Sequence, residues 1–383
     1  MRAEFENQDL SADVNSSQKL SGAKRKGDQS EQDSCSNKFR TTETSTARRE
    51  QSIKQSFGIV DKRESSATSQ NMSQLMKQVQ STYRMDFPPD FEQLWRFCCS
   101  MCPSCPKKAL LDPLGFVLCG PFDLLDGKTI TDPLLHCRYH LDPPEFQTVL
   151  KISSSSDQMH FGYFRDDPNK LPAFVASAKP VKDCVLRYSA DNLLELVYKE
   201  LNSRISKQSA SNSVSSESLL LKLKEKLEVF VSKCDPVVSL NCREKNLKDR
   251  KRKSQGTTFH KLGISVHVKN DIGYRPIHHE DAALRKLMQK VAQCESQPDR
   301  VAAFGPLHEQ ITFVQFANDE SDFGMGLELG LDFFLHGAEC FHKAAAKLLP
   351  TAYKFLKRDL YAEIIEKHLA NREKDQEKID FSI

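Results

Sequence analysis

The chain has 383 residues, a length that suggests two compact domains and some additional sequence. Its formal net charge is only +3, which excludes a surface that binds nucleic acid throughout, so any basic function must be local. The longest apolar runs, such as Phe333–Leu335, are far shorter than the roughly 20 residues of a membrane-spanning helix, and we expect no membrane association.

The N-terminus carries acidic residues and no apolar central region, so no export signal is visible. We therefore expect the 12 cysteines to be free thiols in a reducing compartment.

Residues 1–70 form a polar tail that is rich in Ser, Gln, Asn, Lys and Glu and has no hydrophobic periodicity. Such a composition cannot bury enough apolar surface to offset chain entropy, so we predict disorder there. Residues 373–383 form a second polar tail. The basic triplet Lys24–Lys26 is compatible with a nuclear import signal or with an ordinary solvated tail.

Residues 73–205 are predicted to form an α+β lobe. Helical spacing of apolar residues begins near Ser73, and a second helix follows Pro88, with Asp90 expected as its N-cap. Short apolar stretches between Pro, Gly and Asp turns then predict a small sheet, followed by a helix at 191–201. The expected strands are 115–119, 148–152, 160–164 and 173–176.

Residues 206–218 form a serine-rich connection, and residues 219–372 are predicted to form a mostly helical lobe. Apolar residues at helical spacing mark helices around 219–230 and 284–294, and a third that begins at Pro350. The fold class is therefore α+β, with an N-terminal α/β lobe that contains a small sheet, followed by a mostly helical C-terminal lobe.

Gly324–Gly330 superficially resembles a dinucleotide-binding loop. Its glycine spacing differs from the fingerprint and no strand pattern precedes it, so we interpret it as a turn between helices. We expect this chain to bind no cofactor of its own.

Four cysteines lie within residues 98–105, where the C-x2-C spacing suggests a metal site. A structural zinc site usually needs a second pair of ligands. That pair is missing here unless His136, Cys137 or His140 supplies it, so we expect no metal.

Arg243–Lys253 contains seven basic and two acidic residues and so carries a net charge of +5. Three interpretations remain open for this segment: a solvated loop, a contact with DNA phosphates, and an import signal.

Asp319, Glu320 and Asp322 place three carboxylates in four positions between an apolar stretch and the glycine-rich segment. Clustered carboxylates repel one another, which favours proton uptake near neutral pH and hence a general base. Alternatively, these acids mark a helix terminus, since acidic residues interact favourably with the N-terminal end of the helix dipole.

Six longer motifs occur in order between residues 73 and 372. They are LDPPEFQT at 141–148, GYFRD at 162–166, KNDIGYR at 269–275, FVQFANDE at 313–320, GMGLELG at 324–330 and AEIIEKHLANR at 362–372. In these motifs the chain resembles the histone PARylation factor family.

The resemblance implies a nuclear protein that is not an enzyme as an isolated chain. It would dock beside the NAD site of a DNA-damage-activated poly(ADP-ribose) polymerase and complete a composite active site. Glu320 would act as general base, so that ADP-ribose is transferred from NAD, which the polymerase binds, to serine residues of histones and other proteins. Tyr274, Arg275 and Asp319 match residues that contact the polymerase or hold the glutamate in place.

The resemblance also implies localisation in the nucleus, on chromatin at sites of DNA damage. The alternative function is a chromatin adaptor that bridges histones and polymerase through the basic segment and makes no catalytic contribution.

Overall fold

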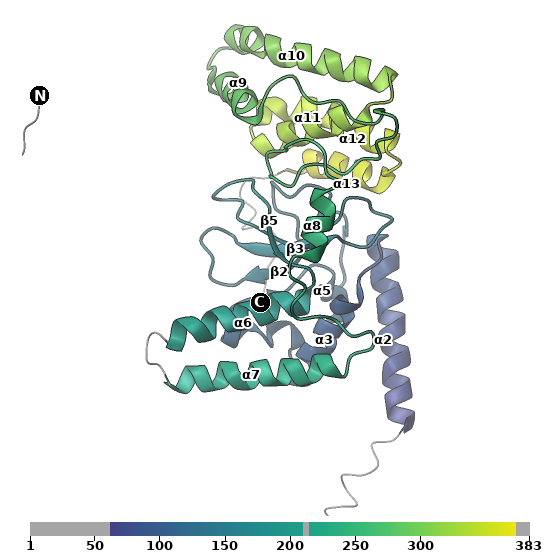
Figure 1. Cartoon of the computed structure of the whole chain (residues 1–383), viewed down its shortest axis with the longest axis vertical. Helices are drawn as coiled ribbons and strands as arrows, with labels where there is room; N and C mark the ends of the chain where they lie inside the picture. Colours follow the sequence, from purple (N-terminus) through teal and green to yellow (C-terminus); the bar gives the residue numbers. More distant parts are fainter. Residues whose placement is uncertain (1–61, 210–213, 373–383) are drawn as a thin grey trace, which may run out of the picture. The chain divides into compact units, whose positions relative to one another are not determined.

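The computed structural model describes residues 62–209 and 214–372. Most of the expected N-terminal tail, including Lys24–Lys26, and the tail at 373–383 lie outside the described residues. The fold is α+β, as predicted (Figure 1). Its first half consists of α2 (Lys62–Tyr83), α3 (Pro89–Met101), η1 (Pro106–Lys108), α4 (Leu111–Leu114), β1 (Phe116–Leu118), α5 (Phe122–Leu125), β2 (Phe146–Ile152), β3 (His160–Phe164), β4 (Phe174–Ala178), β5 (Arg187–Ala190), α6 (Leu193–Ser209) and α7 (Val214–Ser232).

The second half is helical, with long irregular segments between some of its helices. It consists of α8 (Lys245–Lys251), α9 (Asp281–Gln293), α10 (Gln297–Asp319), α11 (Phe323–His336), η2 (Glu339–Phe341), α12 (His342–Phe355) and α13 (Asp359–Ala370). Within the part of the chain that the structure describes, no helix is both long and apolar enough to cross a membrane.

The sheet is an antiparallel meander in which strands β1 to β5 pair in chain order. The four expected strands are confirmed, and β5 is an additional one. Every residue of β3 and β4 is buried, which requires cover on both faces of the sheet. Tyr163 packs in the core that includes α3 and α6, whereas Phe164 packs in a second cluster with Leu247 of α8.

Asp90 is not the N-cap of α3, because that position is occupied by Pro88. Its buried carboxylate instead accepts hydrogen bonds from the Tyr163 hydroxyl (2.7 Å) and from the Leu193 backbone N–H (2.8 Å). Asp90 thus joins α3 to β3 and to the start of α6, and burial raises the pKa of its carboxyl group.

The boundaries of two expected segments differ in the structure. Helix α2 begins at Lys62, within the tail expected at 1–70, and α6 and α7 extend into both sides of the expected connection at 206–218. Helix α7 packs against α6, and its Phe230 ring lies 5.3 Å from that of Phe97 in α3. The helix expected to open the C-terminal lobe therefore belongs to the N-terminal one, because its apolar face is buried there.

Helix α11 is the buried centre of the C-terminal lobe, with every residue from Gly324 to Leu335 buried. The expected turn at Gly324–Gly330 is wrong, because this segment is helical. Its glycines instead permit close packing: a Cβ on Gly330 would lie 2.9 Å from Leu349 Cδ2 in α12. Because glycine has no side chain, α12 can pack closely against α11 at this position.

The expected helix from Pro350 is also two helices rather than one. Pro350 lies inside α12, and the chain then turns through Lys357, whose φ is +58°, before α13 begins at Asp359. Since both helices carry apolar faces at similar spacing, periodicity alone did not reveal the break.

The packing of Gly330 makes a prediction about stability. Overpacking costs about 1–3 kcal/mol and alanine gains about 1 kcal/mol in helix propensity, so Gly330→Ala should lower the free energy of unfolding by up to about 2 kcal/mol. Gly305→Ala in α10 is the control, because a Cβ there meets nothing within 4 Å, so only the helix-propensity gain of about 1 kcal/mol should remain. Urea unfolding of both variants measures the difference, and equal stabilities would contradict the packing argument.

Candidate functional site

Glu320 lies at the C-cap of α10, where the chain turns sharply into α11 (Figure 1). The Ser321 N–H donates to Asn318 O (3.0 Å) and the Asp322 N–H donates to Ala317 O (2.7 Å). With φ of +68° at Ser321, these bonds form a Schellman motif. The turn leaves the Glu320 side chain 61% exposed at the surface.

Arg275 reaches this turn from the irregular segment 254–280. Its Nη2 pairs with Glu320 Oε2 and, at 3.0 Å, with Asp322 Oδ2. The hydrogen bond to Glu320 raises the pKa of Arg275, so the guanidinium is charged. A cation therefore bridges two of the three clustered carboxylates and offsets their mutual repulsion.

Asp322 connects this ion pair to the backbone. Its side chain is only 8% exposed, and its Oδ1 accepts a hydrogen bond from the Gly273 N–H at 2.8 Å. One buried carboxylate thus holds both the backbone at Gly273 and the side chain of Arg275, which in turn holds Glu320. In the sequence Asp322 is one of three clustered acids, and their spacing does not show which carboxylate is buried.

Tyr274 points its hydroxyl inward, where it donates to Glu328 Oε2 of α11 at 2.9 Å. Glu328 Oε1 accepts the Thr257 N–H at 2.9 Å. Burial, followed by the charge of Glu328, raises the pKa of Tyr274, and burial also raises the pKa of Glu328. Tyr274 therefore has a hydrogen-bond partner inside the protein. Glu328, like Asp322, holds the segment 273–275 against α11, and the sequence did not indicate this role.

Gly324 allows the segment around Tyr274 to lie close to α11. The Gly324 N–H donates to Gly273 O at 3.0 Å, and a Cβ on Gly324 would lie 2.9 Å from that oxygen and from the Tyr274 ring. A larger residue would push the Tyr274 and Arg275 backbone away from the turn that carries Glu320.

Asp319 is exposed, and its side chain makes no hydrogen bond or ion pair with the residues that the structure describes. It precedes Glu320 at the end of α10. The structure thus brings all four predicted site residues to the same turn, with Arg275 and Glu320 linked over 45 positions of sequence. Two of them, Asp319 and Glu320, offer exposed carboxylates there.

Arg250 differs from the rest of the basic segment because its side chain is buried. Its side chain is 5% exposed, pairs with Asp166 Oδ1 at 2.7 Å and donates to Gly263 O at 3.1 Å. Its guanidinium also lies 4.8 Å from the centre of the Phe164 ring. Arg250 is therefore a structural residue between α8 and the sheet, whereas the other basic residues are exposed, namely Arg243, Lys245, Lys248, Lys251, Arg252 and Lys253.

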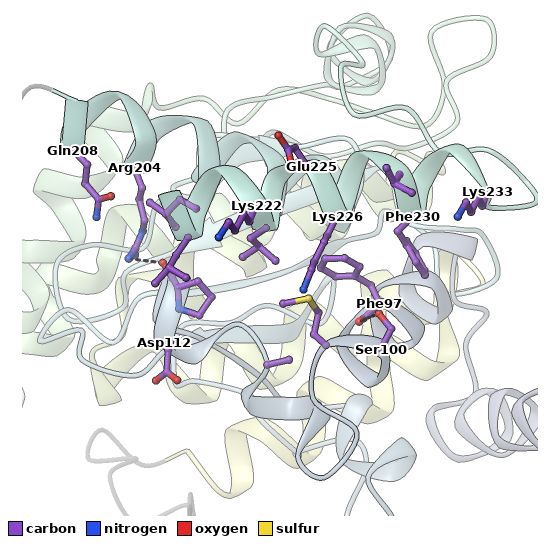
Figure 2. A pocket seen from close by; sticks show the side chains of 17 residues that line it. Phe97, Ser100, Asp112, Arg204, Gln208, Lys222, Glu225, Lys226, Phe230 and Lys233 are labelled. Atoms are coloured by element: carbon purple, nitrogen blue, oxygen red, sulfur yellow. Dashed lines mark hydrogen bonds between the residues drawn. The ribbon is translucent and has the colours of Figure 1, made fainter. Parts of the chain in front are cut away.

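A groove of about 1010 Å³ lies among α3, α6 and α7, and Glu320 does not line it (Figure 2). Phe97 and Phe230 contribute apolar surface, and Lys222, Lys226 and Lys233 line it from α7 or the residue that follows it. The exposed carboxylates of the site lie at the surface instead, where they are accessible to another molecule.

Comparison with known proteins agrees with the motifs. The family model described as Histone PARylation factor 1 matches residues 74–372. The Bos taurus protein named Histone PARylation factor 1 is 44% identical over 309 residues, which cover 79% of this chain and 88% of the relative. The Mus musculus protein of that name is 41% identical over 316 residues, or 80% and 89% of the two chains.

A Homo sapiens protein named Putative histone PARylation factor 1-like is 37% identical over 317 residues, which cover 79% of this chain and 88% of the relative. The match spans most of the described lobes, including the turn at Glu320 and the segment that carries Arg275. The chain therefore belongs to the histone PARylation factor 1 family.

Proposed function

We propose that this chain is a histone PARylation cofactor that has no enzymatic activity alone. It docks on a DNA-damage-activated poly(ADP-ribose) polymerase and supplies Glu320 as general base to a composite active site. The polymerase binds NAD, and ADP-ribose is transferred to serine residues of histones and other proteins. The expected location is the nucleus, on chromatin at sites of DNA damage.

The catalytic part of the proposal rests on one observation. Glu320 presents an exposed carboxylate that is held at the surface by Arg275, itself fixed by the buried Asp322. A base that serves an active site on another protein must be both accessible and preorganised, and this arrangement meets both requirements. Membership of the family supports the coarser role in histone PARylation.

The chemistry needs a base because a neutral serine hydroxyl is a weak nucleophile. As the serine oxygen forms its bond to the anomeric carbon of the nicotinamide ribose, the glycosidic bond to nicotinamide breaks and its electron pair leaves with the nicotinamide nitrogen. Glu320 accepts the serine proton. The ion pair with Arg275 fixes the orientation of the Glu320 carboxylate toward the incoming hydroxyl.

The remaining residues serve docking and positioning. Asp319 has an exposed carboxylate with no partner among the described residues, which suits an ion pair with the polymerase. Arg275 positions Glu320 and is partly exposed, so it can also contact the polymerase. Tyr274 supports the segment through Glu328 and offers part of its ring to the partner.

Glu320→Gln tests the general base. The amide keeps the shape of the side chain but cannot accept the proton, and general base catalysis contributes about 10²–10⁴-fold. We expect serine transfer to a histone peptide to fall at least about 100-fold while co-elution with activated polymerase is retained. Glu309→Gln, at an exposed position on the same helix, is the matched control and should keep full activity. Full transfer by the Glu320 variant would refute the catalytic role.

Tyr274 can be tested by separating its hydroxyl from its ring. Tyr274→Phe removes the hydrogen bond to buried Glu328 and should lower the free energy of unfolding by about 1–2 kcal/mol, with polymerase binding preserved. Tyr274→Ala also removes the ring, and should weaken binding more than about 10-fold if the ring contacts the partner. Equal binding of the Ala and Phe variants in a titration with activated polymerase would show that the ring makes no contact.

A second candidate function, the chromatin adaptor, is favoured by the six exposed basic residues around α8. They face solvent while Arg250 is buried, so they are available to phosphate groups of DNA. In that case the chain would bridge histones and polymerase without contributing a base.

Neutralising Lys251, Arg252 and Lys253 to alanine distinguishes the two functions, since Arg250 stays intact. If Glu320 is the general base, this variant should transfer ADP-ribose to a free histone peptide at a rate within about twofold of wild type. If the segment contacts DNA, the slope of log affinity against log salt concentration should become shallower by about two to three phosphate contacts. The matched control replaces Lys222, Lys226 and Lys233 with alanine. It removes the same number of positive charges from the groove beside α7, and DNA binding should stay unchanged. Loss of peptide transfer in the first variant, with Glu320→Gln active, would favour the adaptor.

A further inference from the structure

Four potential metal ligands meet in the N-terminal lobe, away from the proposed active site. Cys119 follows β1, Asp123 lies in α5, and His136 and Cys137 are consecutive residues in the segment before β2. A carboxylate oxygen of Asp123, a ring nitrogen of His136 and Sγ of Cys137 lie within 4.8 Å of one another. The Cys119 thiol is a near neighbour of the Cys137 thiol, with which it interacts.

The backbone brings two neighbouring side chains to the same point. Cys137 has φ of +56°, a left-handed conformation that residues with a Cβ seldom adopt. This conformation turns the chain so that both His136 and Cys137 reach Asp123. Unusual backbone geometry of this kind is often retained where a ligand is held.

We propose that Cys119, Asp123, His136 and Cys137 bind a structural zinc ion. Two thiolates, an imidazole and a carboxylate form a donor set of the kind that favours tetrahedral Zn²⁺ over Mg²⁺ or Ca²⁺. With bonds of about 2.0–2.3 Å, tetrahedral ligand atoms lie roughly 3–4 Å apart, so Asp123, His136 and Cys137 need only small adjustments, and Cys119 moves toward them to supply the fourth ligand. Cys119, Asp123 and Cys137 are each 4% exposed, which protects the ion from water.

The surroundings of Asp123 fit an outer shell for such a site. Asp123 Oδ2 lies 2.8 Å from the ligand His136 (Nε2) and is the oxygen that faces the site, whereas Lys107 Nζ contacts the other oxygen, Oδ1, from outside. A ligating carboxylate usually has its second oxygen bound in this way. Zinc with two thiolates and one carboxylate carries a net charge of −1, which the Lys107 ammonium balances.

Other cysteine-containing clusters lack this arrangement. Within the described residues, Cys98–Cys105 forms no group of three potential ligands. Asp191, Glu195 and Cys242 do form one, but backbone N–H groups already occupy both carboxylates. Glu195 accepts from Asp191 and Cys242, and Asp191 accepts from Asn246.

The test uses the full chain, reduced with a phosphine and stripped of metal with a chelator. Zn²⁺ affinity is measured by competition with a chromophoric chelator, and Co²⁺ serves as a spectroscopic probe. We expect one ion per chain, with the thiolate-to-cobalt charge-transfer absorption and the intense visible bands of a tetrahedral site. Cys119→Ser and Cys137→Ser should each weaken Zn²⁺ binding more than about 100-fold, beyond the loss typical of an outer-shell change.

The paired variant Cys102→Ser with Cys105→Ser is the control, since it removes the C-x2-C motif and should bind zinc as wild type does. Circular dichroism confirms folding of each variant, and the wild-type Co²⁺ spectrum reports thiolate ligation without any variant. Absence of stoichiometric binding overturns the proposal, as does binding that survives Cys137→Ser or is lost in the control. A Cys119–Cys137 disulfide formed in air by a chain that binds no metal when reduced would also overturn it.

Discussion

The candidate site depends on the buried carboxylate of Asp322. A charge removed from water is costly unless it is paired and hydrogen-bonded, and Asp322 meets this need with Arg275 and with the Gly273 N–H. Both partners come from a segment nearly 50 residues away in sequence. The exposed Glu320 is positioned through the same arginine, so its orientation results from this long-range contact rather than from the helix that carries it.

The same principle extends along α11. Its Glu328 accepts the Thr257 N–H at 2.9 Å, and its Asp332 accepts the Phe259 N–H at 2.7 Å. Together with Asp322, these acids provide acceptors for backbone donors of a long segment that has few ladder bonds of its own. Burial raises the pKa of both Glu328 and Asp332. A helix with acids at intervals of one to two turns thus holds an irregular chain in place.

Helical spacing and turn residues predicted the fold class and the strands, because these depend on local pattern. They did not predict that α7 packs with the N-terminal lobe, since an apolar helix face does not identify its partner. Charge counting likewise found the basic segment but could not distinguish buried Arg250 from its exposed neighbours. The glycines of Gly324–Gly330 are compatible with a turn or with close helix packing, and only the structure distinguishes the two.

By itself, the sequence determined that carboxylates cluster at 319–322, that the motifs around them resemble one family, and that the chain has an α+β organisation. Only the tertiary structure decided which carboxylate is buried and which is exposed, and that Arg275 joins the two. It also brought Cys119 and Asp123 to His136 and Cys137. The physical reason is that burial and pairing are set by contacts between distant segments, whereas residue type and spacing describe only the local chain.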